Sequence, residues 1–242
     1  MTKTTQELIK RQSIRIYTDK KISKKDKDLI IDATINAPSA GNMQLYSIID
    51  IKDRKIINRL AELCDHQDFI KKAKMVFIFC ADYQKWYDAF NHLNLKVRKP
   101  NMGDLLLSIE DAVIAAQNSV TAAYSLGIGS CYIGDIMENF EEVTNLLSLP
   151  QYVYPACMVV YGYPDKKHIQ KQKPKRFDNK YVIFANKYNR LDENSLKKMF
   201  KDRVNPRGYK EWMEAFSKRK YDSDFSKEMS RSANLYINRY KK

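Results

Sequence analysis

The first residues suited to chemistry are two arginines four positions apart, Arg11 and Arg15, with Gln12 and Ser13 between them. Guanidinium groups form charge-assisted hydrogen bonds with phosphate, and the amide and hydroxyl add further polar groups beside them. The spacing is therefore consistent with an anion-binding site. It is equally typical of a solvated helix end, and the segment alone leaves both interpretations open.

A second candidate is the segment APSAGNMQ at residues 37–44. A helical pattern ends at Pro38, and small polar residues follow it. Such a loop lets the backbone approach a flat ligand closely and offers hydroxyl and amide hydrogen bonds from Ser39 and Asn42, with Gly41 between them. A plain turn between a helix and a strand is the alternative interpretation.

Two later segments add to these candidates. The segment GIGSCYIG at residues 127–134 contains three glycines, which indicates backbone brought close to another group, with N–H groups able to donate. A basic segment, KPKR, contains Lys173, Lys175 and Arg176. On its own, this segment is a solvated loop.

Several kinds of active site have no sequence signature here. There is no GxSxG, Walker A, HExxH or protein-kinase pattern, so an enzyme of this sequence needs a cofactor to carry the chemistry. The three histidines form no HxxxH, and we expect no metal site. The four cysteines, which form no CxxC pair, are expected to be buried and non-catalytic: Cys64, Cys80, Cys131 and Cys157.

The chain is strongly basic, with 43 Lys+Arg against 29 Asp+Glu and a net charge of +14. The lysines are spread along the chain, and no zinc-finger, RRM or KH pattern accompanies them, so nucleic-acid binding is only a remote alternative. No apolar run reaches the roughly 18–20 residues that span a bilayer. The polar N-terminus lacks a signal-peptide core, and we expect a cytoplasmic protein without membrane contact.

Hydrophobic periodicity predicts a mixed α+β chain with a few buried strands among long helices. The longest helix, over 104–126, has a wide alanine-rich stripe that suits close packing in the centre of the fold. No GxGxxG follows a strand, so a Rossmann domain is not supported. Helices are expected at 5–11, 24–37, 54–63, 83–94, 104–126, 138–147, 192–201, 209–219 and from 224 onwards. Strands are expected at 46–51, 75–81 and 154–161, and a short strand or turn at 131–134.

Each segment is a weak signal alone, but their order and spacing are specific. RxSxR, APSAGNMQ, GIGSCYIG, then GYP and KPKR, together resemble the nitroreductase family over nearly the full length, most closely its branch of oxygen-insensitive nitroreductases and flavin reductases. The resemblance implies an α+β nitroreductase-like fold, with a central, mostly antiparallel sheet flanked by helices. It also implies an intertwined homodimer. We expect one domain over 1–242, with an FMN-binding core to about residue 190 and a helical C-terminal extension from about 191 that wraps the partner.

The resemblance also assigns roles to residues. Arg11, Gln12, Ser13 and Arg15 would lie at the phosphate and ribityl end of FMN. Arg176 and either Lys173 or Lys175 would approach the same end. Ser39 and Gln67 would meet the isoalloxazine ring, and the backbone of Tyr132, Ile133 and Gly134 would face it. The candidate substrate-binding residues are Gly41, Asn42, Arg203 and Arg207.

Four departures from that branch concern substrate and reductant preference more than FMN binding. Arg11-Gln12 stands where the branch usually has His-Arg, and Asp135 replaces a second glycine after Gly134. The KPKR loop has one extra residue. The segment before Arg203 is shorter.

The implied activity is an FMN-dependent NAD(P)H oxidoreductase that works by a ping-pong mechanism on small-molecule acceptors such as nitroaromatics, quinones or free flavins. Arg203 and Arg207 predict NADPH over NADH, and the alternative for these two is a pair of solvated surface arginines. A non-catalytic flavin-binding or sensor protein is the main alternative function. Apolar residues near the C-terminus are expected to face the partner subunit: Trp212, Phe216, Phe225, Leu235, Tyr236, Ile237 and Tyr240.

Overall fold

The fold is built on a four-stranded antiparallel sheet. The computed structural model describes residues 1–165, 173–204 and 208–241. The strands lie in the order β1-β2-β4-β3, and every neighbouring pair is antiparallel. This confirms the expected fold class. Their bounds are β1 (Tyr46–Asp50), β2 (Met75–Asp82), β3 (Gly129–Ile133) and β4 (Val153–Gly162).

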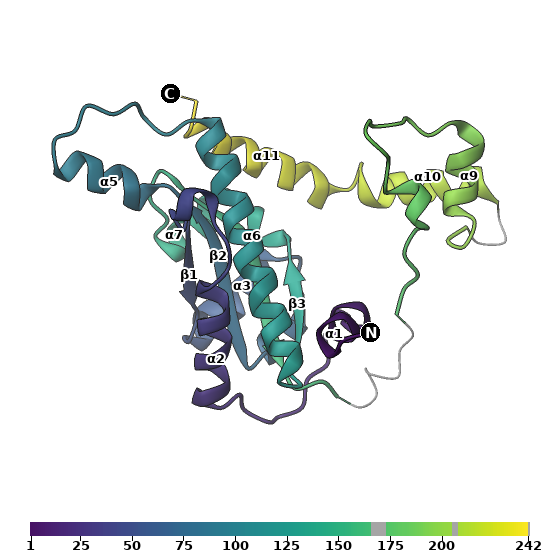
Figure 1. Cartoon of the computed structure of the whole chain (residues 1–242), viewed down its shortest axis with the longest axis horizontal. Coiled ribbons are helices and arrows are strands. Elements are labelled where there is room, and N and C mark those ends of the chain that lie inside the picture. The colour runs from purple at the N-terminus through teal and green to yellow at the C-terminus, as the bar shows by residue number, and fades with distance from the viewer. Residues whose placement is uncertain (166–172, 205–207, 242) are drawn as a thin grey trace. The chain divides into compact units, whose positions relative to one another are not determined.

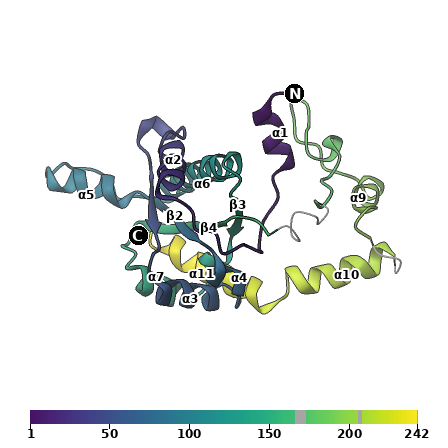
Figure 2. The ribbon, with the colours of Figure 1, turned by 90° about the horizontal axis from the view of Figure 1, so that it is seen from below.

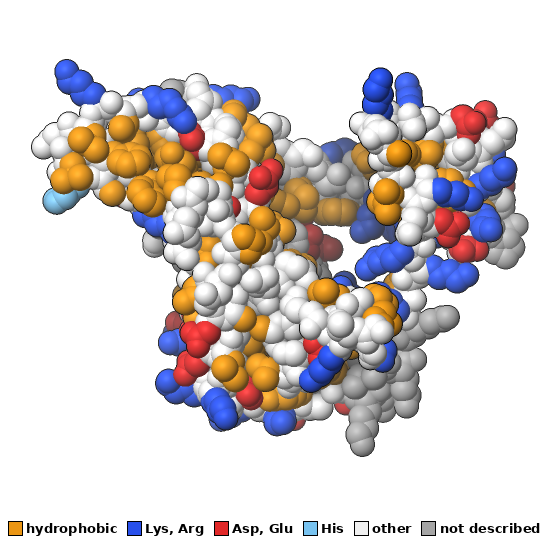
Figure 3. All heavy atoms as spheres, viewed as in Figure 1, with side chains coloured by type: hydrophobic (Ala, Val, Ile, Leu, Met, Phe, Trp, Pro, Cys, Tyr) orange, Lys and Arg blue, Asp and Glu red, His pale blue; other side chains and the backbone are white. Residues whose placement is uncertain are grey.

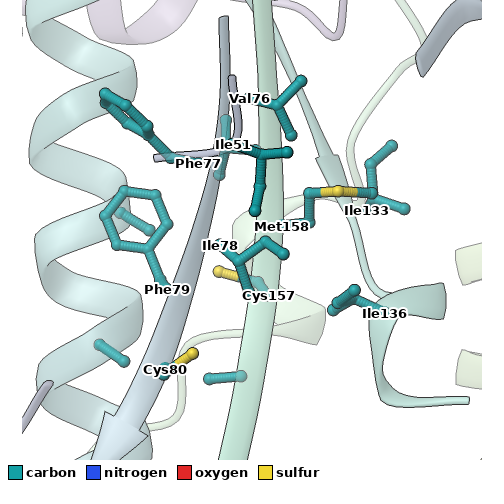
Figure 4. Close-up of a cluster of buried hydrophobic side chains, with 14 of the residues drawn as sticks. Ile51, Val76, Phe77, Ile78, Phe79, Cys80, Ile133, Ile136, Cys157 and Met158 are labelled. Atoms are coloured by element: carbon teal, nitrogen blue, oxygen red, sulfur yellow. The ribbon is translucent and has the colours of Figure 1, made fainter. Parts of the chain in front are cut away.

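The two central strands are buried along their whole length, as their continuous apolar sequences require. Side chains of β2 alternate between the faces of the sheet, with Phe77 and Phe79 on one side and Ile78 on the other (Figure 4). Pro155 lies inside central β4, where a missing N–H is normally costly. It is tolerated because it pairs with Cys80 next to a β-bulge between Phe79 and Cys80.

Helices cover both faces of this sheet (Figures 1 and 2). On one face lie α2 (Lys24–Ile35) and the long α6 (Met102–Ser125); on the other lie α3 (Arg54–Leu63) and α7 (Phe140–Leu147). Buried alanines along α6 allow close approach to the strands, as predicted. A hydrogen bond of 2.6 Å between the Ser119 and Tyr161 hydroxyls joins α6 to β4.

Most predicted elements are confirmed to within a few residues. Ser23 caps α2 and accepts a hydrogen bond from the Asp26 N–H. Short α4 and three 3₁₀ turns were not predicted, because so few residues carry no periodicity. The remaining elements are α1 (Lys3–Lys10), η1 (Ala40–Asn42), α4 (Asp68–Lys72), α5 (Gln84–His92), η2 (Asp135–Met137), η3 (Asn179–Tyr181), α9 (Glu193–Phe200), α10 (Tyr209–Lys220) and α11 (Asp224–Asn238).

The chain divides into two compact units. Unit 1 comprises Met1–Gln170 and Glu228–Lys242 and contains the sheet; unit 2 is Lys171–Lys227. Unit 2 has a small aromatic core, in which the Phe200 ring lies 5.4 Å from Phe177 and 5.7 Å from Trp212. The expectation of one domain with an extension from about residue 191 stays a prediction.

The C-terminal part of unit 1 corrects one expectation. Tyr236 and Tyr240 do not face a partner, because both are buried in their own chain. The Tyr236 ring contacts Phe140 at 4.6 Å and Tyr154 at 5.0 Å, and the Tyr240 ring contacts Tyr152 at 5.3 Å. Among the described helices, none is long and apolar enough to cross a membrane.

Candidate functional site

The segment after α1 is fixed along one end of the sheet. Ser13 forms a bridge with Ser130 of β3, and the Ile14 N–H donates to the Ser130 carbonyl over 2.9 Å. Farther along, Tyr17 forms a bridge with Pro164, just beyond β4. These contacts hold the backbone that carries Arg11 and Arg15 against the edge of the sheet.

Two glycines let this segment approach so closely. Gly129 of β3 pairs directly with Gly162 of β4. A Cβ on Gly129 would lie 2.5 Å from Cγ1 of Ile14, and a Cβ on Gly162 would lie 2.7 Å from the ring of Tyr17. The expected close approach at Gly129 is therefore confirmed, and its partner is the chain's own N-terminal segment.

The charges of Arg11 and Arg15 both act on the buried thiol of Cys131. Burial raises the pKa of this thiol, while the charges of Arg15 and Arg11 and a hydrogen bond with the Ser13 side chain act in the opposite direction. The Nη1 atom of Arg11 is buried and has no hydrogen-bond partner. A buried guanidinium nitrogen without a partner is costly, so the site is suited to an anion that would pair with it.

Gln67 comes to the same place from the turn between α3 and α4. Asp65 and His66 both have positive φ, and this left-handed turn leads into Gln67 at the start of α4. The Gln67 amide donates to the Cys64 carbonyl over 2.9 Å and to the Asp135 carboxylate.

The remaining residues of the GIGSCYIG segment lie at and beyond the end of β3. Tyr132 is half-buried, and its hydroxyl donates to Oε1 of Gln117 over 3.3 Å. The Ile133 side chain is buried in the core, while Gly134 is exposed immediately after the strand. The half-buried Gln12 precedes the Ser13 bridge. On α4, the Phe69 ring lies 5.7 Å from the Arg15 guanidinium carbon and joins the two parts of the site.

A buried acid lies behind the Gln67 turn. Glu138 is only 4% exposed, and its Oε1 atom has no partner. Burial, together with the charges of Asp135, Asp65 and Glu228, raises the pKa of Glu138 to about 7. In the described part of the chain, no group of three His, Cys, Asp or Glu residues could hold a metal ion, so these acids form no evident metal centre.

The loop with Ser39 lies at the opposite end of the sheet. It leads into Tyr46, which pairs with Ala81 at the end of β2, whereas the N-terminal segment joins β3 at its beginning. The buried carboxylate of Asp111 accepts hydrogen bonds from the N–H groups of Ala40, at 2.8 Å, and Leu45, at 3.0 Å. One chain therefore does not bring Ser39, Gly41 and Asn42 together with Arg11 and Gln67.

Unit 2 contains a separate basic pocket of about 650 Å³. The Arg203 guanidinium lies 3.9 Å above the centre of the Phe177 ring, and Lys175 forms an ion pair of 3.4 Å with Asp202. Arg207 lies outside the described residues. The KPKR segment and Arg203, the residue predicted to select NADPH, both line this pocket. Its lining comprises Lys173, Pro174, Lys175, Arg176, Asp202 and Arg203.

Comparison with known proteins assigns this arrangement to a family. The nitroreductase family pattern matches residues 8–163, which contain the whole sheet and the Arg11 to Asp135 site. The chain is a member of the nitroreductase family. It is 34% identical to the oxygen-insensitive NADPH nitroreductase of Salmonella typhimurium over 197 residues, covering 81% of this chain and 79% of that protein. It is also 34% identical to the FMN reductase [NAD(P)H] of Bacillus subtilis, covering 71% of this chain and 70% of that protein.

Solved nitroreductase structures share the fold. Nitroreductase A from Vibrio parahaemolyticus superposes with a TM-score of 0.77 at 28% identity, covering 84% of each chain. The NADPH:FMN oxidoreductase from Vibrio harveyi, complexed with NAD⁺, superposes with a TM-score of 0.78 at 25% identity, covering 98% of this chain and 97% of that one. The second likeness extends over nearly the whole chain.

Two acids that contact candidate site segments were not predicted from the sequence: Asp111 contacts the Ser39 loop, and Asp135 contacts Gln67. Asp135 was noted only as a departure, and Asp111 was hidden in the helical stretch over 104–126. An acid at a buried helical position, among apolar neighbours, was a usable signal for Asp111, because buried carboxylates are normally paired. The contact between Gln67 and Asp135 had no sequence signal, since it depends on the turn at Asp65 and His66.

Proposed function

We propose that this nitroreductase-family protein is an FMN-dependent NAD(P)H oxidoreductase that reduces small-molecule acceptors such as nitroaromatics, quinones or free flavins. The names of its relatives, an NADPH nitroreductase and an FMN reductase, support the activity. The observation that carries the proposal is the buried, unpartnered Nη1 of Arg11, beside Arg15 and Ser13. A phosphate dianion would satisfy that guanidinium, so the residues fit the phosphate end of FMN.

The residues of the chain serve to bind and position. FMN, when bound, supplies the redox chemistry, taking a hydride from NAD(P)H and passing electrons to the acceptor. Arg11, Ser13 and Arg15 would hold its phosphate and ribityl end, and Gln67 would meet its ring. A ping-pong order follows if donor and acceptor use the same place in turn, and no side-chain acid or base is required.

A homodimer is part of this proposal. A second copy would bring the Ser39 loop of one chain to the Arg11 site of the other, which a single chain keeps apart. The apolar residues Leu106, Leu107, Val113 and Ile114 of α6 are 39–56% exposed. Apolar side chains also gather over α5 and the segment after it, where Leu93 is 67% exposed (Figure 3). Exposed apolar surface of this extent suits an interface with a second copy.

The preferred donor is proposed to be NADPH, and the pocket in unit 2 supports this. NADPH differs from NADH by one phosphate, and selecting it needs a cation placed away from the flavin. Arg203 is such a cation, and its stacking on Phe177 leaves the edge of the guanidinium able to donate. The cytoplasmic location expected from the sequence stays a prediction.

The phosphate site can be tested by comparing FMN with riboflavin, which lacks the phosphate. Arg11→Ala should weaken FMN binding by about 1.5–3 kcal/mol, the range for a charge-assisted hydrogen bond, and should change riboflavin binding little. Flavin-fluorescence titration measures both affinities. Lys10→Ala removes a neighbouring exposed charge and is the matched control.

If Lys10→Ala and Arg11→Ala weaken FMN binding equally, the loss reflects the general positive charge of the segment. The proposal that Arg11 binds the FMN phosphate is then wrong. Equal affinity of the unaltered protein for FMN and riboflavin would contradict it as well. Steady-state NADPH oxidation with a quinone separates the enzyme from a flavin-binding sensor on the same fold, because a sensor that binds FMN would show no turnover.

A further inference from the structure

The amide of Gln67 is held in one orientation. Its nitrogen donates to the Cys64 carbonyl over 2.9 Å and to the Asp135 carboxylate. A side-chain amide has two N–H hydrogens, and these two acceptors use both. Turning the amide over would place its oxygen against two acceptor oxygens, which is repulsive.

Gln67 can therefore only accept a hydrogen bond from a ligand. The turn that carries it is also held independently of Asp135. The Gln67 N–H donates to the Ala61 carbonyl over 3.0 Å, and the Asn139 amide donates to the Leu63 carbonyl over 2.8 Å. The contact between Asp135 and Gln67 is thus not needed to shape the backbone, and its specific effect is on the side-chain amide.

We propose that Asp135 is a positioning residue that fixes Gln67 as a hydrogen-bond acceptor for the N3–H group of the FMN ring. This rests on the proposed function, which places the ring beside Gln67. The oxidised isoalloxazine ring has one N–H group, at N3, and its other polar ring atoms are acceptors. An acceptor-only side chain that meets the ring has N3–H as its only ring partner.

The position of Asp135 suits this role. It directly follows the exposed Gly134, and its charge helps to raise the pKa of Cys131, the same thiol on which Arg11 and Arg15 act. The charges of the acid and of the two arginines therefore all act on the same thiol of β3. Asp135 is half-buried and belongs to a single turn of 3₁₀ helix outside the strands, so we expect a substitution there to leave the sheet intact.

The test compares FMN with 3-methyl-FMN, in which a methyl group replaces the N3 hydrogen. Fluorescence titration gives the ratio of the two dissociation constants without any measurement of turnover. The unaltered protein should prefer FMN by about tenfold or more, because the methylated ring offers Gln67 no donor. In Asp135→Ala only the Cys64 carbonyl still binds the amide nitrogen, so one N–H of Gln67 becomes able to donate to a ring carbonyl, and the ratio should fall several-fold.

Asp135→Asn is the conservative control. It keeps an acceptor oxygen for Gln67 but removes the charge, so it should retain the ratio of the unaltered protein. Asp135→Gly, which also removes the acceptor, should behave as Asp135→Ala does and replaces it if that variant does not fold. A purely structural role for Asp135 would weaken both flavins equally and leave the ratio unchanged.

The outcomes separate this inference from the proposed function. FMN binding with the same ratio in Asp135→Ala or Asp135→Gly as in the unaltered protein contradicts the inference alone. Equal affinity of the unaltered protein for both flavins contradicts it too, because Gln67 then does not pair with N3–H. Failure of the unaltered protein to bind FMN contradicts the proposed function and the inference together.

Discussion

At the scale of single residues, Glu138 is the clearest source of pH dependence. Its carboxyl is buried beside Asp135, Asp65 and Glu228, and its pKa is raised to about 7. The folded protein therefore keeps a proton that the unfolded chain loses at lower pH. Stability should be highest below the pKa of an exposed carboxyl and should decline as the pH rises towards about 7.

Glu138→Gln should remove this decline. At pH 8 the variant should be more stable to urea than the unaltered protein by roughly 3 kcal/mol, because each unit of the upward pKa shift of Glu138 corresponds to about 1.36 kcal/mol. At pH 5 the difference should be much smaller. The exposed Glu214→Gln is the control and should show no such pH dependence. A constant difference between Glu138→Gln and the unaltered protein at both pH values would contradict the burial of an ionisable Glu138.

The second prediction for a single residue concerns Arg203 and the preference for NADPH over NADH. Removing it should cost roughly 1.5–3 kcal/mol of NADPH binding and almost none of NADH binding, since only NADPH has the extra phosphate. The kcat/KM for both donors, measured in the unaltered protein and in Arg203→Ala, checks this. Lys201→Ala is a control because it removes an exposed charge from the same region. An equal loss of kcat/KM for NADPH and NADH in Arg203→Ala would contradict a contact between Arg203 and the additional phosphate of NADPH.

At the scale of elements, the N-terminal segment depends on the flat surface that Gly129 and Gly162 provide. In Gly129→Ala the new Cβ would overlap Ile14, and overpacking of this kind costs about 1–3 kcal/mol. The segment with Arg11 and Arg15 should shift, and FMN affinity should fall about tenfold or more. Fluorescence titration measures this loss.

Gly103→Ala is the control for that substitution. Nothing lies within 4 Å of a Cβ at Gly103, which belongs to α6, so FMN affinity should not change. Full FMN affinity in Gly129→Ala, with a correctly folded protein, would show that the segment does not need this close approach.

The sequence predicted the long elements well and the local geometry poorly. The continuous apolar run of β2 predicted a buried strand, and the wide alanine-rich stripe of α6 predicted a central helix. The structure confirms both elements. The Gln67–Asp135 contact depends on two left-handed residues, Asp65 and His66, whose conformation no local pattern indicates. The order of the motifs indicated the nitroreductase family, in which the Ser39 loop and the Arg11 segment were both expected at the flavin. It did not indicate that the two segments lie at opposite ends of the sheet within one chain.

At the scale of the whole molecule, the central prediction is a homodimer. The exposed apolar face of α6 should form part of an interface larger than about 2,000 Å², the size typical of obligate dimers. The double variant Leu107→Glu/Ile114→Glu, two residues seven apart on this helix, should sediment as a monomer and lose most FMN affinity. Analytical ultracentrifugation checks the mass, and fluorescence titration checks the binding.

Asn145→Glu adds the same kind of charge at an exposed position on α7, across the sheet from α6, and should remain dimeric. An unaltered protein that sediments as a monomer yet holds FMN tightly would show that one chain completes the site without a second copy.

The most direct test of the proposed function is an anaerobic titration of the purified protein followed by its visible absorption spectrum. We predict a yellow protein from which acid releases FMN. One equivalent of NADPH per bound flavin should bleach the flavin band, and a quinone added afterwards should restore it. A colourless protein that takes up no added FMN, or a bound flavin that neither NADPH nor NADH bleaches, would contradict an FMN-dependent NAD(P)H oxidoreductase.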